Sequence, residues 1–159
     1  MDKTINYLVV TYTKERHNEY CCLHHHGVIY PMITYIVSLA LCVPPPSGTD
    51  VTGYLSAIRQ VESSGKDNAV GDNGKAIGPY QIHREYWVDA TTYDPSIGGV
   101  YKDCFKEPYA RKIVIAYMSR YAPNWNLSTI AGIHNGGPKG HVRKSTQVYR
   151  NKVTKEYND

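Results

Sequence analysis

The chain is short of two residue types that small proteins often rely on. Of its 4 Cys, only Cys104 follows residue 42, which excludes a disulfide framework within the rest of the chain. It contains 1 Phe beside 15 Tyr. A groove lined with tyrosine would suit the faces of sugar rings, although tyrosine more often fills the core and the surface. The absence of repeats and heptads excludes solenoid and coiled-coil architectures.

Long hydrophobic runs are also lacking. The apolar run from Ile33 to Val43 is too short to span a bilayer, so we expect no stable membrane association. It is similar to the apolar region of a signal peptide, with cleavage after Cys42 and translation starting at Met32, which predicts a secreted protein. A buried strand or helix is the alternative. With the Pro-rich segment at 44–46, these features predict a leader over residues 1–48 and one domain over 49–159.

The charge of the chain is modest. The formal net charge is +4, and the first 42 residues contribute none of it, since their three basic and three acidic side chains cancel. This excess would attract either a bacterial wall or a nucleic acid, and it is too small to decide between them. A mildly basic surface that keeps the protein soluble is the commoner reason for such an excess. We predict a monomer without a nucleic-acid partner.

Residues 1–31 show no reliable periodicity. The run from His24 to His26 superficially suggests a metal site, but adjacent side chains point in different directions. Cys21 and Cys22 lack the spacing of metal ligands. We therefore predict neither a metal nor a cofactor.

Apolar residues at helical spacing predict several helices in the second part of the chain. The expected helices are 51–62, capped by Thr49 or Asp50, then 81–90, 108–121, 128–134 and 145–157. The helix that begins at Pro108 has the clearest buried stripe, so we expect it to be the central packing helix. In the last helix, Val148, Tyr149 and Val153 are expected to face inward.

Two carboxylates follow one another closely in the chain. Glu62 lies at the end of the first predicted helix, where the partial negative charge of the helix terminus favours a protonated carboxyl group. Asp72 lies in a Gly-rich segment that predicts a hairpin or folded loop returning towards Glu62. Glycosidic bond cleavage needs such a pair, one group to protonate the leaving oxygen and one to assist at the anomeric carbon. Either residue alone would more often be a solvated surface charge.

Four blocks of sequence resemble the signature of the invertebrate-type lysozymes, the family that includes destabilase. They are Glu62-Ser-Ser-Gly, the block from Gly78 to Ala90, the block from His134 to Gly140, and the block from Tyr149 to Val153. The resemblance implies an α+β, lysozyme-like fold, mainly helical, with a small β-hairpin or loop beside the active-site cleft. It also implies hydrolysis of the β-1,4 bond between N-acetylmuramic acid and N-acetylglucosamine in peptidoglycan.

The resemblance assigns roles to individual residues. Glu62 and Asp72 would be catalytic, although Asp72 is slightly nearer to Glu62 than the family pattern has it. The implied substrate-binding residues are Ser63, Tyr80, Gln81, His134, Asn135 and Gly136. On sequence alone, a lone histidine such as His134 is more often a structural residue. The family's disulfides cannot form here, because only Cys104 lies in the matched region.

Three other functions are compatible with the same residues. A lytic transglycosylase would use Glu62 alone and leave Asp72 structural. An isopeptidase, as destabilase-like members imply, would need Ser63 or Ser64 beside a histidine. A protein that binds peptidoglycan without cleaving it would keep the groove and lack the chemistry.

Overall fold

The structure is a computed structural model that describes residues 44–159. The predicted leader segment at 32–42, the histidine run, and the three N-terminal cysteines lie outside the described residues. Five helices of three turns or so form the described domain: α1 (Val51–Ser63), α2 (Arg84–Tyr93), α3 (Glu107–Tyr121), α4 (Leu127–Gly136) and α5 (Gln147–Asn158). Three very short strands form an antiparallel sheet: β1 (Val70–Gly71), β2 (Ala76–Ile77) and β3 (Ile82–His83).

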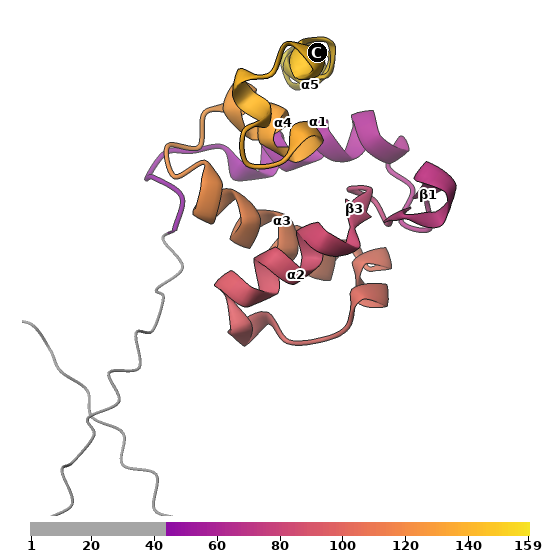
Figure 1. Cartoon of the computed structure of the whole chain (residues 1–159). Coiled ribbons are helices and arrows are strands. Elements are labelled where there is room, and N and C mark those ends of the chain that lie inside the picture. The colour runs from indigo at the N-terminus through magenta and orange to yellow at the C-terminus, as the bar shows by residue number, and fades with distance from the viewer. Residues whose placement is uncertain (1–43) are drawn as a thin grey trace, which may run out of the picture. The chain divides into compact units, whose positions relative to one another are not determined.

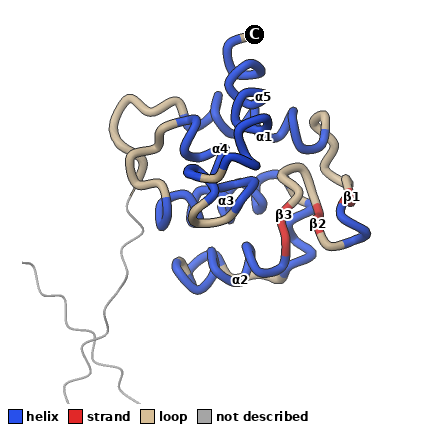
Figure 2. The backbone as a smooth tube through the Cα atoms, turned by 45° about the horizontal axis from the view of Figure 1, so that its top comes forward, coloured by secondary structure: helices blue, strands red, loops and turns tan. Residues whose placement is uncertain are grey.

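The helices lie in two groups. Helix α5 packs against α1 and α4, and helix α2 packs against α3. Figure 1 shows α5 above α1, α4 overlapping α1 in this view, and α2 and α3 below it. Figure 2 shows the three short strands beside these helices. The mainly helical α+β fold with a small hairpin is therefore confirmed.

Helix α1 begins at the predicted residue, Val51, and ends at Ser63, one residue beyond the predicted end. The side chain of Asp50 accepts a hydrogen bond from the backbone N–H of Gly53, at 2.9 Å, and so caps the helix. At the other end, Ser64 adopts a left-handed conformation with φ of 52°, which stops the helix directly after Ser63. Glu62 is consequently held on the last turn of a well-defined helix.

The sheet brings the chain back towards α1. Val70 pairs with Ile77, and Ile77 in turn pairs with Ile82. The turn between β2 and β3 starts at Gly78, which has φ of +78° and lies against the carbonyl oxygen of Cys104; a Cβ atom there would come within 1.9 Å of that oxygen. Only glycine meets both conditions, so this position fixes the turn.

Helix α3 supplies much of the core, as its sequence predicted. Ile113, Val114 and Met118 are fully buried, and Tyr117 is nearly so. They join a cluster with Leu55 and other apolar residues from the remaining helices. The one cysteine among residues 44–159, Cys104, is free and buried. Apolar packing in one continuous cluster therefore stabilises this domain in place of disulfides.

Several tyrosines among residues 44–159 combine an apolar ring with a hydroxyl group that forms a hydrogen bond. Tyr121 donates to Asp89 at 2.6 Å, and Tyr109 donates to the backbone oxygen of Gly98 at 2.7 Å. Tyr101 donates to the backbone of both Lys75 and Ile82, at 2.9 and 2.7 Å. Each ring therefore packs against the core while its hydroxyl group ties neighbouring segments together.

Three predictions about helices were wrong in detail. The second helix was expected to begin at Gln81, but Gln81 lies in a turn with φ of 46° and the next two residues form β3, because Ile82 pairs with Ile77. Helix α4 continues through Gly136 and does not end at His134. Val148 was expected to face inward, but it is 67% exposed, whereas Val153 on the same helix is fully buried.

None of the helices in residues 44–159 has the length and apolar character needed to cross a membrane.

Candidate active site

A polar cavity of about 250 Å³ lies among α1, the small sheet and α4. Two carboxylates line it, Glu62 from the last turn of α1 and Asp72 from the turn between β1 and β2. The other lining residues are Ala76, Gln81, His83, His134 and Asn135. The predicted return of the hairpin towards Glu62 is confirmed, since both carboxylates belong to one cavity.

The two carboxylates have different surroundings. The side chain of Glu62 is 18% exposed, whereas that of Asp72 is 67% exposed. Glu62 Oε1 accepts a hydrogen bond from the hydroxyl group of Tyr149 at 2.6 Å, and His134 Nε2 lies 3.6 Å from the same oxygen. Glu62 is thus enclosed and oriented by protein groups, while Asp72 faces water.

His134 is nearly buried, with 3% of its side chain exposed. Its Nε2 lies 3.0 Å from the backbone oxygen of Tyr80, and its Nδ1 lies 3.4 Å from the hydroxyl group of Tyr86. Burial lowers the pKa of His134, and the nearby Glu62 opposes this shift. The imidazole is therefore held in its neutral form between the acid and the core.

This burial predicts an acid-sensitive contribution to stability. Below about pH 6.5, His134 of the unfolded chain gains a proton, whereas burial disfavours that proton in the folded protein. The free energy of unfolding therefore decreases as the pH is lowered. One such group contributes at most about 1.4 kcal/mol per pH unit. Urea unfolding between about pH 5 and pH 7.5 measures this slope, and His134→Gln, which never gains a charge, should flatten it. Equal slopes in the two proteins would refute this assignment.

Asp72 is held by a neighbour that the sequence did not identify. Its Oδ2 lies 2.8 Å from Nε2 of His83, the second residue of β3. The turn that carries Asp72 is also unusual, since Asp72 and Asn73 both adopt left-handed conformations, with φ of 47° and 54°. The His83 contact therefore fixes a carboxylate that a short exposed turn would otherwise leave free to rotate.

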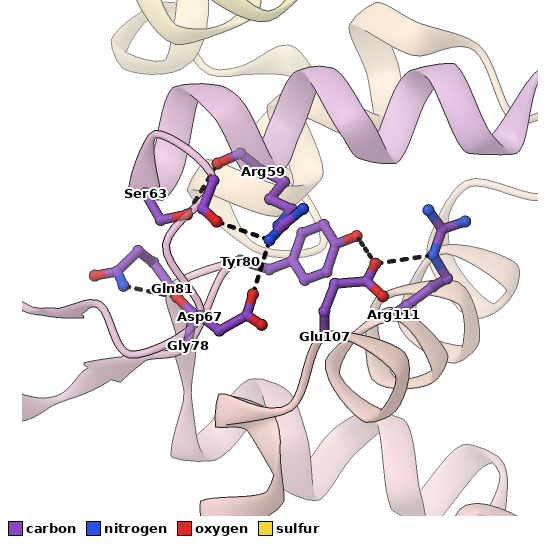
Figure 3. A network of polar contacts seen from close by, with 9 residues as sticks. Arg59, Ser63, Asp67, Gly78, Tyr80, Gln81, Glu107 and Arg111 are labelled. Carbon is purple, nitrogen blue, oxygen red and sulfur yellow. Dashed lines mark hydrogen bonds and ion pairs between the residues drawn. The ribbon is translucent and has the colours of Figure 1, made fainter.

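Three predicted substrate-binding residues, Ser63, Tyr80 and Gly136, do not line the cavity. The Tyr80 side chain is fully buried, and its hydroxyl group donates to Glu107 at 2.9 Å, a carboxylate that also accepts from Arg111 (Figure 3). The hydroxyl group of Ser63 donates to the backbone oxygen of Arg59 at 3.1 Å. Both side chains are thus committed to interactions within the protein. A serine nucleophile would need a base, and the partner of Ser63 is a carbonyl group.

The other three predicted residues, Gln81, His134 and Asn135, line the cavity. The side-chain amide of Gln81 donates to the backbone oxygen of Gly78 at 2.9 Å (Figure 3). The side-chain oxygen of Gln81 lies against Gly71, where a Cβ atom would come within 2.3 Å of it. Gly136 does not line the cavity; it packs against Thr146, which a Cβ atom would approach to 2.7 Å.

Arg59 fixes the segment between α1 and β1. Its guanidinium group donates to the backbone oxygen of Gly65 at 2.7 Å and to Asp67 at 2.9 Å (Figure 3). Both partners lie just beyond the end of α1. The first half of the segment that carries Asp72 is therefore tied to the helix that carries Glu62.

The sequence did not identify Tyr149, His83 or Ala76 as site residues. Tyr149 was expected to face inward on the last helix, and it belongs to one of the four matching blocks. Its role as the partner of Glu62 has no local signal, because 87 positions separate the two residues. His83 offered a weak signal, since it lies within the block that begins at Gly78.

The one cysteine among residues 44–159 is poorly suited to act as a nucleophile. Burial raises the pKa of the Cys104 thiol to about 12, so the thiolate form is scarce near neutral pH. Within residues 44–159, no group of histidine, cysteine and carboxylate side chains is arranged to hold a metal ion.

Known proteins are similar to this chain in both sequence and structure. It is 33% identical to "Lysozyme 1" of Crassostrea virginica, over 70% of this chain and 66% of that protein. It is 34% identical to a lysozyme of Ostrea edulis, over 49% and 58% of the two chains. The chain thus spans less than two thirds of the length of these oyster proteins. The crystal structure of Tapes japonica lysozyme matches with a TM-score of 0.56 and 30% identity, over 65% of this chain and 87% of that one.

A family profile described as Destabilase matches residues 52–156, which include every residue that lines the cavity. This match, the sequence relatives and the shared fold together show that the chain belongs to the destabilase family of invertebrate-type lysozymes.

Proposed function

We propose that the protein is a lysozyme that hydrolyses the β-1,4 bond between N-acetylmuramic acid and N-acetylglucosamine in bacterial peptidoglycan. The observation that carries this proposal is the pairing of an enclosed and an exposed carboxylate, Glu62 and Asp72, in one polar cavity. Membership of a family whose relatives are named lysozymes supports it.

In the proposed reaction, Glu62 donates its proton to the glycosidic oxygen as the bond to the anomeric carbon breaks. Asp72 lines the cavity, where its carboxylate either attacks the anomeric carbon or stabilises the positive charge that develops there. Protein groups hold both carboxylates, Glu62 through Tyr149 and Asp72 through His83. Little reorganisation is therefore needed when the substrate enters.

We propose that Gln81 and Asn135 bind the sugar rings. Both line the cavity, and both carry an amide that can donate and accept hydrogen bonds. His134 contributes mainly by holding Glu62 and the Tyr80 backbone in place. The proposed partner is the bacterial wall, and the role is defence or digestion outside the cell, as the predicted leader segment suggests.

The decisive test combines two readouts on the purified protein. Turbidity loss of a bacterial wall suspension measures cleavage, and mass spectrometry of the released fragments identifies the bond that breaks and the product that forms. We expect lysis with release of fragments that end in a reducing muramyl sugar. Binding to the wall without soluble fragments would contradict the proposal and identify a non-catalytic binder.

A lytic transglycosylase is the second proposal, because Asp72 is engaged by His83 at 2.8 Å. In such an enzyme Glu62 acts as both acid and base, and the 6-hydroxyl group of the muramic acid attacks within the substrate. The Asp72–His83 contact would then only stabilise the turn. Anhydromuramyl products, which are lighter than the hydrolysis products by one water, would select this reaction.

A further inference from the structure

The two oxygens of the Glu62 carboxyl group have different partners. Oε1 accepts a hydrogen bond from the hydroxyl group of Tyr149 at 2.6 Å, and His134 Nε2 lies 3.6 Å from the same oxygen. No hydrogen bond within the described residues reaches Oε2. Tyr149 comes from α5 and does not line the cavity, so its contact with Glu62 comes from the protein interior.

The partners of His134 fix which of its nitrogens carries hydrogen. Nε2 lies 3.0 Å from the backbone oxygen of Tyr80, and a carbonyl oxygen can only accept. Nε2 therefore carries the hydrogen. Burial lowers the pKa of the ring, so Nδ1 is free to accept the hydroxyl group of Tyr86 at 3.4 Å. Every protein group near Glu62 Oε1 is consequently a hydrogen-bond donor.

Tyr149 is also a lasting donor. Burial raises the pKa of its hydroxyl group well above the usual range, and the charge of Glu62 adds to this effect. The phenol accordingly keeps its proton over the pH range in which a carboxyl acid works. It can donate to Glu62 both before and after Glu62 has given up its own proton.

We infer that Tyr149 is a positioning residue for the acid: by occupying Oε1 with its hydroxyl group, it confines the transferable proton of Glu62 to Oε2. In a neutral carboxyl group, the carbonyl oxygen is the better acceptor, so the oxygen bonded to Tyr149 is the one without the proton. The proton passes from Oε2 to the glycosidic oxygen, which takes the electron pair of the breaking bond. Glu62 is left as a carboxylate that Tyr149 stabilises.

This inference rests on the proposed function, and Tyr149→Phe tests it because only the hydroxyl group is removed. We expect kcat to fall roughly tenfold with little change in KM, since the carboxylate loses a donor and the acid loses its fixed orientation. The alkaline limb of the pH–rate profile should move up by roughly one pH unit, because the charged form of the acid is less stabilised.

The titratable groups that face or lie near Glu62 are His134 on α4, Tyr149 on α5, Tyr86 on α2, and Asp72 and His83 along the cavity.

The same helix provides a matched control. Tyr157 donates its hydroxyl group to Asp50 at 3.2 Å, so it forms another bond from α5 to a carboxylate at the far end of α1. Tyr157→Phe should leave kcat, KM and the pH profile as in the natural protein. A Tyr149→Phe variant that keeps both kcat and the alkaline limb would overturn the inference. A loss of kcat without a shift of the alkaline limb would mean that Tyr149 has only a structural role, and this result would also overturn the inference.

A second readout separates this inference from the proposed function. Carbon-13 NMR of labelled glutamate follows the titration of the Glu62 carboxyl group without any substrate. We expect its titration midpoint to rise by roughly one pH unit in Tyr149→Phe and to stay in place in Tyr157→Phe. If the natural protein proves inactive on walls but the midpoint moves, the proposed function fails and the contact is supported. An unmoved midpoint overturns the inference whether or not the protein is active.

Discussion

Replacing Glu62 with Gln is expected to lower the rate of peptidoglycan cleavage roughly a thousandfold, the loss typical of removing a general acid. Glutamine has the same shape but no proton to give to the glycosidic oxygen. Turbidity loss of a wall suspension, with fragment release by mass spectrometry, measures this effect. Because both proposed reactions use Glu62 as the acid, the prediction holds for a lysozyme and for a transglycosylase.

The structure explains why this variant should fold. The side-chain oxygen of glutamine can accept the hydroxyl group of Tyr149 at 2.6 Å, as Glu62 Oε1 does, and it leaves no buried donor unpaired. Alanine at this position would leave that hydroxyl group without a partner. Glu156→Gln is the matched control, since Glu156 is an exposed glutamate on α5 that does not line the cavity. Lysis retained in Glu62→Gln would refute the assignment of the acid.

The sequence predicted those parts of the fold that depend on local signals. Asp50 caps α1, and Pro108 lies in the first turn of α3, because capping and proline geometry involve only a few neighbouring residues. The buried stripe of α3 followed from its periodicity alone. Boundaries that depend on pairing with distant residues were harder to place. Gln81 lies in a turn because Ile82 pairs with Ile77, and no helical periodicity encodes that pairing.

The site divides in the same way. Glu62 and Asp72 could be proposed as a carboxylate pair from the sequence because their residue types, the helix end and the turn signals are local. Their partners, Tyr149 and His83, are brought to them by tertiary packing. Tyr80 shows the opposite error: it belongs to a matching block, yet its side chain is fully buried and bonded to Glu107. A matching block identifies a region of the site without showing which of its side chains face the cavity.

Replacing Asp72 with Asn is expected to lower the rate of hydrolysis roughly a hundredfold, because a neutral amide can neither attack the anomeric carbon nor stabilise positive charge there. Binding to the wall should persist, because Gln81 and Asn135 still line the cavity. The same turbidity and fragment assays measure the effect. Asp159→Asn is the matched control, since Asp159 is an exposed aspartate that does not line the cavity.

Asp72→Asn removes the carboxylate charge and also weakens the contact with His83. A second variant, His83→Asn, separates the loss of charge from the loss of this contact. It removes the imidazole 2.8 Å from Asp72 and leaves the carboxylate charge in place. A hydrolase that needs the charge should lose far more activity in Asp72→Asn than in His83→Asn. Similar small losses in both variants, beside an inactive Glu62→Gln, would mean that Asp72 only stabilises its turn. The chemistry would then be carried by Glu62 alone, and anhydromuramyl products would have to appear in place of reducing ends.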